Sequence, residues 1–296
     1  MNTPSSAKRV RKAVIVAAGY GTRFLPATKA TPKEMLPVID KPVIQYVVEE
    51  AVESGIEDII LVTSATKRPL EDHFDDNETL ELWLKKQGKL DLLKAIKRIG
   101  KMANFIYIRQ KGPYGNGTPV ANAEPVVGDE PFAVFFGDEI VDHPKHRLAQ
   151  MIETFNHYQD PILSVIPVNA DATKRYGIID PLAKLDSRTY QVRGIVEKPG
   201  PEKAPSRLAA IGAYILTPDI FTELRRLKAG RNGEYWLVDA IQALMKKRPI
   251  YARQIDGDYY DTGSKIGWLK ANIAFALKRP EMRDEVKKML KEIGKK

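Results

Sequence analysis

Short apolar runs alternate with segments of helical periodicity along the first half of the chain. The runs are rich in β-branched and aromatic residues, which is typical of buried strands. They cover residues 13–17, 59–62, 105–108, 132–136 and 162–168. Between them, apolar residues recur at helical spacing over 42–54, over 78–99 with a weak point at Gly88, and over 145–158. Strands separated by helices predict an α/β fold with a doubly wound, mostly parallel, Rossmann-like sheet flanked by helices.

The pattern changes after about residue 176. Strand-like pieces, interrupted by Pro and Gly, are expected at 177–179, 191–196 and 208–216. They are followed by helices at 218–228, 237–247, 264–278 and 281–293, and by a strand at 250–255. No repeat or linker divides the chain, so we expect one domain over 1–296. Its parts would be an α/β part at about 12–170, a small β-rich part at about 171–263 and C-terminal helices at about 264–296.

Composition narrows the class of protein. Hydrophobic residues make up 43% and charged residues 29%, as in ordinary globular proteins. No apolar run approaches the length of about 20 residues that spans a bilayer, and the N-terminus is polar and basic. We therefore expect neither a membrane segment nor a secretory signal. The chain has no cysteine, which excludes disulfides, thiol nucleophiles and cysteine-ligated metals and favours a cytoplasmic protein.

The net charge of +9 favours anionic partners. The sequence has neither zinc-finger spacing nor a motif of interleaved basic and aromatic residues, so we expect no nucleic-acid partner and no membrane partner. Phosphorylated small molecules are the favoured ligands.

The loop after the first apolar run carries the strongest chemical signal. It begins with a Gly-x-Gly turn at 19–21, and the cations Arg23, Lys29 and Lys33 follow. At the carboxyl end of a strand, such a turn lets backbone N–H groups approach a phosphate. The loop lacks the third glycine of the dinucleotide fingerprint and the Gly-Lys-Ser/Thr of the P-loop, and it contains two prolines. It therefore predicts triphosphate binding by a long irregular loop.

With this loop the sequence resembles the sugar-phosphate nucleotidyltransferases, whose signature is Gly-x-Gly-Thr-Arg, then Pro, then Pro-Lys. Here these are residues 19–23, Pro26 and Pro32-Lys33. Four further segments are similar in particular to bacterial UTP–glucose-1-phosphate uridylyltransferases: LPATKA at 25–30, PKEMLP at 32–37, DKP at 40–42 and IQYVVEEA at 44–51. The resemblance covers most of the chain. It implies a nucleotidyltransferase fold of the GT-A type, in which the first part binds the nucleotide and the second the sugar.

The resemblance implies a nucleotide site. Arg23 would bind the outer phosphates of the nucleotide, and Lys33 would contact the α-phosphate that is attacked. The implied nucleotide-binding residues are Ala18, Gly19, Gly21 and Thr22 in the first loop, and Gln110, Gly115 and Gly117 in a base-recognition loop.

The base-recognition loop departs from the family pattern. Thr118 and Pro119 stand where the family often has His-Ala, which leaves the base preference open. We expect Thr118 to be the N-cap of a helix that has Pro119 in its first turn.

The resemblance also implies a Mg²⁺ site. Asp138, at the end of the run 132–136, and Asp261, in the segment YDTG, would be the acidic groups at the metal. Glu139 and Asp142 lie close to Asp138 in sequence, and we expect them to be loop or capping residues.

A sugar site is implied by the segment VEKP and by two glycines. Glu197 would accept hydrogen bonds from sugar hydroxyls, and Lys198 would pair with the sugar phosphate. Gly177 and Gly212 would let the sugar lie against the backbone.

The implied reaction joins UTP and α-D-glucose 1-phosphate to give UDP-glucose and pyrophosphate. The second pKa of a phosphate is about 6, so the attacking oxygen is already ionised and no general base is required. Two alternatives stay open: an enzyme that uses dTTP or another sugar phosphate, and a non-catalytic nucleotide-sugar sensor. The apolar, basic region 266–293 fits packing either against a second subunit or within the chain. The family resemblance implies a homo-oligomer, either a dimer or a tetramer.

Overall fold

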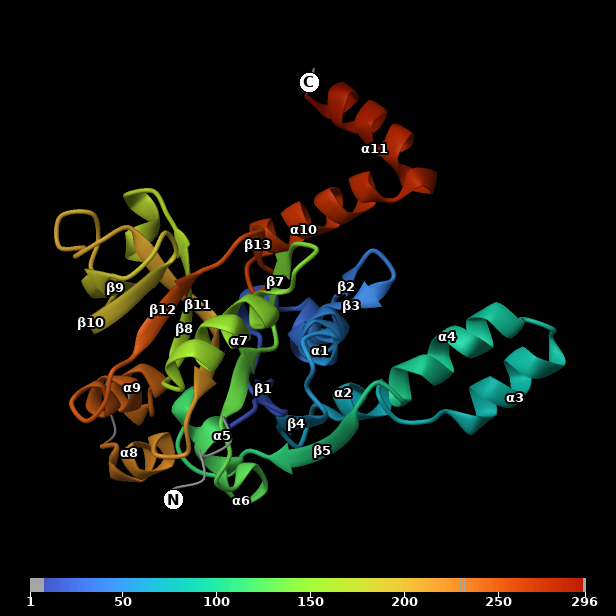
Figure 1. Cartoon of the computed structure of the whole chain (residues 1–296). Helices are drawn as coiled ribbons and strands as arrows, with labels where there is room; N and C mark the ends of the chain where they lie inside the picture. The colour runs from blue at the N-terminus through green and yellow to red at the C-terminus, as the bar shows by residue number, and fades with distance from the viewer. Residues whose placement is uncertain (1–7, 229, 231–232, 295–296) are drawn as a thin grey trace.

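The computed structural model describes residues 8–228, 230 and 233–294, and its centre is a nine-stranded sheet (Figure 1). The strand order is β5-β4-β1-β6-β11-β8-β12-β10-β9. The first four strands come from the predicted apolar runs: β5 (Asn104–Arg109), β4 (Asp58–Thr63), β1 (Lys12–Val16) and β6 (Phe132–Phe136). They pair in parallel, as strands with crossover connections do.

The other five strands make the sheet mixed. They are β11 (Leu208–Leu216), β8 (Ile162–Pro167), β12 (Tyr251–Gln254), β10 (Thr189–Glu197) and β9 (Gly177–Lys184). β11 is antiparallel to β6 and β8, β12 is parallel to β8, and β10 is antiparallel to β12 and β9. The expectation of a mostly parallel sheet therefore holds for the N-terminal strands alone. No helix lies between β9, β10 and β11 in the described part of the chain, and strands joined without a crossover helix pair antiparallel.

Helices cover both faces of the sheet, which confirms the doubly wound α/β architecture. The helices on one face are α1 (Val43–Glu53) and α7 (Arg147–Tyr158). Those on the other face are α5 (Gly117–Asn122), α6 (Glu124–Val127), α8 (Ile220–Arg226) and α9 (Leu237–Met245).

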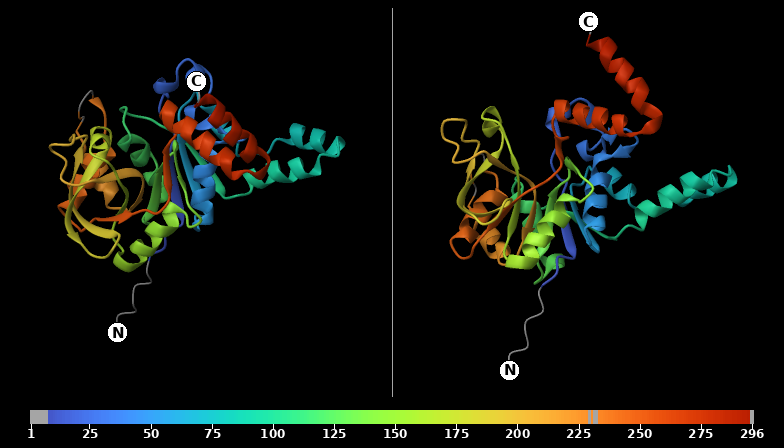
Figure 2. Two further views of the ribbon diagram at one scale, coloured as in Figure 1. Left: turned by 90° about the horizontal axis from the view of Figure 1, so that it is seen from above. Right: turned by 45° about the horizontal axis from the view of Figure 1, so that its top comes forward.

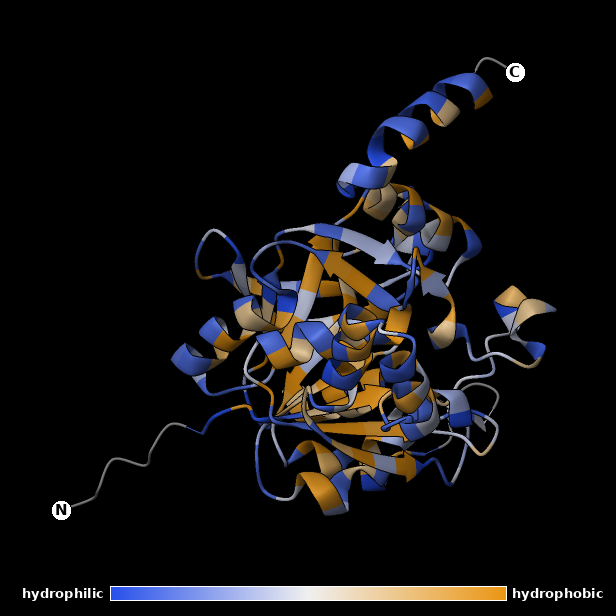
Figure 3. Cartoon of the chain, turned by 90° about the vertical axis from the view of Figure 1, so that its right-hand side faces the viewer, coloured by the Kyte–Doolittle hydropathy of each residue, from blue (hydrophilic) through white to orange (hydrophobic). Residues whose placement is uncertain are grey.

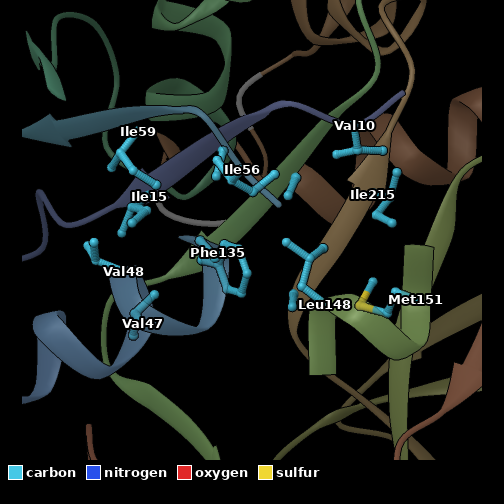
Figure 4. Close-up of a cluster of buried hydrophobic side chains, with 14 of the residues drawn as sticks. Val10, Ile15, Val47, Val48, Ile56, Ile59, Phe135, Leu148, Met151 and Ile215 are labelled. Atoms are coloured by element: carbon cyan, nitrogen blue, oxygen red, sulfur yellow. The ribbon is translucent and has the colours of Figure 1, made fainter. Parts of the chain in front are cut away.

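The alternation along β1 shows how the two faces are filled. Ile15 packs in the cluster under α1 and α7, whereas its neighbour Val14 packs in the cluster under α5, α8 and α9. Figure 4 shows the first cluster, which groups Ile15 with Val47 and Val48 of α1. Both faces of the central strands are thus buried, which is why the runs in the sequence are continuously apolar. Figure 3 shows the hydrophobic residues concentrated on these strands.

The segment 78–99, expected to be helical with a weak point at Gly88, is two helices. α3 (Glu78–Lys86) ends before Gly88, whose φ of 70° is left-handed, and α4 (Leu90–Gly100) begins after it. The two helices form a hairpin that projects from the body, as Figures 1 and 2 show. Gly88 ends the first helix because a residue without Cβ adopts this conformation at little cost.

Two small sheets and the C-terminal helices frame the carboxyl ends of the central strands. β7 (Glu139–Asp142) pairs with β13 (Asp258–Asp261), and β2 (Pro37–Val38) pairs with β3 (Lys41–Pro42). α10 (Lys265–Lys278) follows β13 directly, and α11 (Pro280–Ile293) extends from it as an arm (Figure 2). None of the helices in the described residues is both long and apolar enough to cross a membrane.

Candidate active site

A cleft of about 740 Å³ opens at the carboxyl ends of β1 and β6. Ligands bind at this edge of open α/β sheets because the loops that follow the strands converge there. Eight of the residues predicted from the motifs line the cleft: Gly19, Arg23, Lys33, Gln110, Gly115, Asp138, Lys198 and Asp261. Segments that are far apart in the sequence thus meet in one place.

Seven predicted residues do not line the cleft: Ala18, Gly21, Thr22, Gly117, Gly177, Glu197 and Gly212. Gly21 shapes the loop, since its φ is 68° and a methyl group there would lie 3.2 Å from Cβ of Lys33. Gly177 and Glu197 face each other across the β9–β10 pair. Each of these seven residues is next to a lining residue in the sequence or packs against one.

Lys33 and Asp138 form an ion pair inside the cleft. Lys33 lies in the short 3₁₀ turn η3 (Lys33–Met35), and its Nζ is 2.5 Å from Oδ2 of Asp138, just after β6. Burial disfavours the charged form of both groups, but their mutual attraction outweighs it. The pKa of Lys33 is therefore raised and that of Asp138 is lowered. Both groups are charged at neutral pH.

A second carboxylate, Asp261, is brought beside Asp138 by the β7–β13 pair. A methyl group at Gly263 would lie 2.2 Å from Oδ2 of Asp138 and 3.1 Å from Oδ1 of Asp261, so the two carboxylates converge. Burial and the charge of Asp138 raise the pKa of Asp261, and Arg23 Nη1 lies 4.0 Å from it. Within the described residues no group of three or more His, Cys, Asp or Glu is placed to hold a metal. Two carboxylates suit Mg²⁺, which completes its shell with phosphate oxygens and water.

Under Lys33 lies a buried ion pair that the sequence did not indicate. Lys67 Nζ donates to both carboxylate oxygens of Glu34 at 2.8 Å, and both side chains are buried. Burial raises the pKa of Glu34 and lowers that of Lys67. The pair ties η3 to the start of α2 (Arg68–Asp72) and so holds the backbone that carries Lys33. Neither residue stands out locally, because a lone Glu or Lys in a polar loop is usually solvated.

Glu139 and Asp142 lie in strand β7, so the expectation that they are loop or capping residues is wrong. Glu139 belongs to a second buried cluster of charged side chains. The side chain of Arg147 is fully buried and donates to both oxygens of Glu50, at 3.1 and 3.2 Å, and to Glu139 at 3.3 Å. Oε2 of Glu139 also accepts the N–H of Gly212 at 2.7 Å. Burial raises the pKa of Glu139 to about 7, although Arg147 opposes the shift.

A sequence signal for this cluster existed. Arg147 precedes Met151 and Phe155 by one and two helical turns, and Glu50 follows Val47 by one turn. Both charged residues therefore occupy the apolar face of their helices, where a charge is buried only when it is paired. Gly212 belongs to the same cluster, since a methyl group there would lie 2.5 Å from Phe136 and 2.8 Å from Glu139.

The base-recognition loop is fixed against residues 235–237. Gly117 N donates to the carbonyl oxygen of Tyr235 at 2.9 Å, and Tyr235 N donates to the carbonyl oxygen of Tyr114 at 2.8 Å. A methyl group at Gly115 would lie 2.2 Å from the Tyr235 oxygen. Close backbone packing thus explains the two glycines of this loop.

The expected N-cap role of Thr118 is wrong. α5 begins at Gly117, so Thr118 is inside the helix, and its buried hydroxyl has no hydrogen-bond partner among the described residues. Asn116 stands at the N-cap position instead, and its side-chain oxygen accepts the N–H of Leu237 at 2.8 Å.

Of the residues predicted to bind the sugar, Lys198 reaches the cleft. Lys198 lines it with a left-handed φ of 47°, and its Nζ is 3.2 Å from the carboxylate of Glu197. Both side chains are about half exposed. Tyr176 and Glu234 also line the cleft.

Comparisons with known proteins agree with the motifs and the cleft. The sequence model of the family described as Nucleotidyl transferase matches residues 12–276. A UTP–glucose-1-phosphate uridylyltransferase of Staphylococcus haemolyticus is 49% identical over 97% of this chain and 99% of its own length.

Two solved structures share the fold over nearly their whole length. A UTP-bound UGPase from Acinetobacter baumannii has a TM-score of 0.88 and 39% identity, over 96% of this chain and 99% of that one. A UDP-glucose pyrophosphorylase complexed with UDP-glucose has a TM-score of 0.83 and 43% identity, over 91% of this chain and 100% of that one. The resemblance seen in the motifs is therefore confirmed, and the chain belongs to the nucleotidyl transferase family.

Proposed function

We propose that this protein is a UTP–glucose-1-phosphate uridylyltransferase, which makes UDP-glucose and pyrophosphate from UTP and α-D-glucose 1-phosphate. The observation that carries the proposal is the cleft in which Arg23, Lys33, Lys198 and the pair Asp138 and Asp261 meet. Near-full-length similarity to uridylyltransferases and to a UTP-bound structure supports the choice of substrates. The substrates are charged metabolites, and we propose that the enzyme acts in the cytoplasm.

In the proposed mechanism an ionised phosphate oxygen of the sugar phosphate attacks the α-phosphorus of UTP. A new P–O bond forms as the bond to the β-phosphate oxygen breaks, and pyrophosphate leaves with the electron pair. No side chain has to move a proton, because the nucleophile is already ionised. Lys33 holds the α-phosphate, Lys198 holds the sugar phosphate and Arg23 steadies the leaving pyrophosphate.

Asp138 and Asp261 would hold Mg²⁺. When bound, the ion would neutralise charge on the reacting phosphates. The proposed roles require Lys33 and Asp138 to part when substrates bind, because in the structure they neutralise each other. A phosphate then replaces Asp138 as the partner of Lys33.

A grid of nucleoside triphosphates and sugar 1-phosphates, with and without Mg²⁺, tests the substrate proposal. We expect the highest kcat/KM for UTP with glucose 1-phosphate, and pyrophosphate release that requires the metal. A higher kcat/KM with dTTP would show a thymidylyltransferase, which the altered residues Thr118 and Pro119 keep as the second candidate. Absence of pyrophosphate release with every pair would overturn the proposal and favour the sensor.

We also propose that the protein is a homo-oligomer, either a dimer or a tetramer. Support comes from apolar side chains exposed on the two projecting parts of the molecule, the α3–α4 hairpin and helix α11: Leu80, Leu82, Trp83, Leu90, Leu92, Met289 and Ile293. Clustered exposed apolar side chains, such as those on the hairpin, are typical of a protein–protein interaction site.

The mass in solution tests this proposal. Light scattering coupled to size exclusion should give a multiple of the 33.3 kDa chain mass. Exchanging Leu82 and Leu92 for Glu should lower that mass, whereas exchanging Lys85 and Lys94 of the same hairpin for Glu should affect it less. A wild-type protein that elutes as a monomer at micromolar concentration would contradict the proposal.

A further inference from the structure

Two tyrosines stack on each other beside the cleft although water reaches both. The ring centroids of Tyr20 and Tyr114 are 5.7 Å apart, and the ring planes differ by 12°. Tyr20 is 72% exposed and Tyr114 is 48% exposed. Tyr20 belongs to the 19–21 turn and Tyr114 to the base-recognition loop, so the pair bridges the two loops assigned to the nucleotide. Because the pair is not buried in the core, aromatic surface stays available to a ligand.

Tyr114 faces the nucleotide end of the cleft. It lines the cleft together with Gly19 and Gln110. A methyl group at Gly19 would lie 3.8 Å from the Tyr114 hydroxyl oxygen, so the side chain of Tyr114 reaches over the backbone of the turn. A ligand bound against Gly19 and Gln110 would therefore meet this ring.

The backbone presents Tyr114 rigidly. Its carbonyl oxygen accepts the N–H of Tyr235, and Gly115, with a φ of 127°, packs on the Tyr235 backbone without room for a Cβ. Tyr20 stacks on one face of the ring. A side chain held in this way loses little conformational freedom on binding, which favours affinity.

We infer that Tyr114 is a nucleotide-binding residue whose ring lies against the flat face of the nucleobase, and that Tyr20 is a positioning residue that braces it. The inference rests on the proposed function. It gives the altered base-recognition loop a contact that does not depend on the histidine of the family pattern. Stacking uses the π-face that every base has, so this contact adds affinity but little discrimination between bases.

Calorimetric titration of UTP with Mg²⁺, beside steady-state kinetics, tests the pair. Tyr114→Ala should weaken UTP and dTTP binding by the same factor, about tenfold. It should raise KM for UTP and leave kcat and KM for glucose 1-phosphate unchanged, because the contact is equal in the ground and transition states. Tyr114→Phe keeps the ring and is the matched control, which should bind like wild type.

Tyr20 has its own test. Tyr20→Ala should weaken UTP binding by about twofold to threefold in the wild-type background and have no further effect in the Tyr114→Ala background, because it acts through Tyr114. Wild-type affinity in Tyr114→Ala, or equal effects of Tyr20→Ala in both backgrounds, would overturn the inference. These results are distinct from failure of the proposed function, in which the wild-type protein itself would make no UDP-glucose.

Discussion

Replacement of Lys33 by alanine should lower kcat by about 10²- to 10³-fold while the protein stays folded. The expected loss is large because the ammonium group of Lys33 lines the cleft and would neutralise the negative charge of the reacting phosphate. Asp138→Ala should have an effect of similar size, since it removes a carboxylate of the proposed Mg²⁺ site. The measurement is pyrophosphate release at saturating UTP and glucose 1-phosphate.

The fold should survive both changes because the side chains of Lys33 and Asp138 keep 18% and 15% of their surface exposed in the cleft, where water can reach the group left behind. Circular dichroism and the unfolding temperature report on this. Lys41→Met is the matched control, since Lys41 also forms an ion pair of 2.5 Å, with Glu49, but does not line the cleft. That variant should turn over like wild type. Near-normal turnover of Lys33→Ala would contradict the proposed mechanism.

Replacement of Arg147 by methionine should reduce the free energy of unfolding by about 3–5 kcal/mol. The guanidinium is fully buried and is the counter-ion of both Glu50 and Glu139. Methionine fills much of the space but leaves two buried carboxylates without their counter-ion. Urea denaturation at pH 7 measures the change.

A paired substitution separates charge from packing. If the lost counter-ion is the cause, Arg147→Met combined with Glu50→Gln should recover part of the stability. The penalty of Arg147→Met alone should also shrink at lower pH. Burial raises the pKa of Glu139 and Arg147 lowers it, so without Arg147 this pKa would rise further. Glu139 would then bind a proton more readily in the folded than in the unfolded state, so the penalty is smallest at low pH and grows as pH rises.

Arg193→Met is the control for the loss of an ordinary ion pair. Arg193 contacts Asp180 at 2.8 Å but is largely exposed, and such pairs contribute about 0–1 kcal/mol. An Arg147→Met variant no less stable than Arg193→Met would contradict the assigned role of the cluster.

Much of the fold was predictable because its signals are local. The four parallel strands are apolar on both faces and are therefore visible as continuous runs. Gly88 marked the break between α3 and α4 as an ordinary helix stop does. The mixed half of the sheet was less predictable, since β9, β10 and β11 pair through hairpins and long-range contacts that no single segment specifies.

The motifs identified the residues that meet in the cleft because their chemistry depends on residue type and on position after a strand. Arg23, Lys33 and Asp138 follow β1 and β6, which are neighbours in the sheet. Asp261 joins them only through the β7–β13 pair, and neither of those strands was expected.

The sequence by itself determined the buried strands, the family and the cations and carboxylates available for phosphate and metal. Only the tertiary structure decided how charges and aromatic rings are partnered. Glu34 meets Lys67, Glu50 meets Arg147, and Tyr20 stacks on Tyr114, although each pair is distant in sequence. The physical reason is that the energy of such contacts depends on distance and on burial, which the packing of the whole chain sets and local sequence does not.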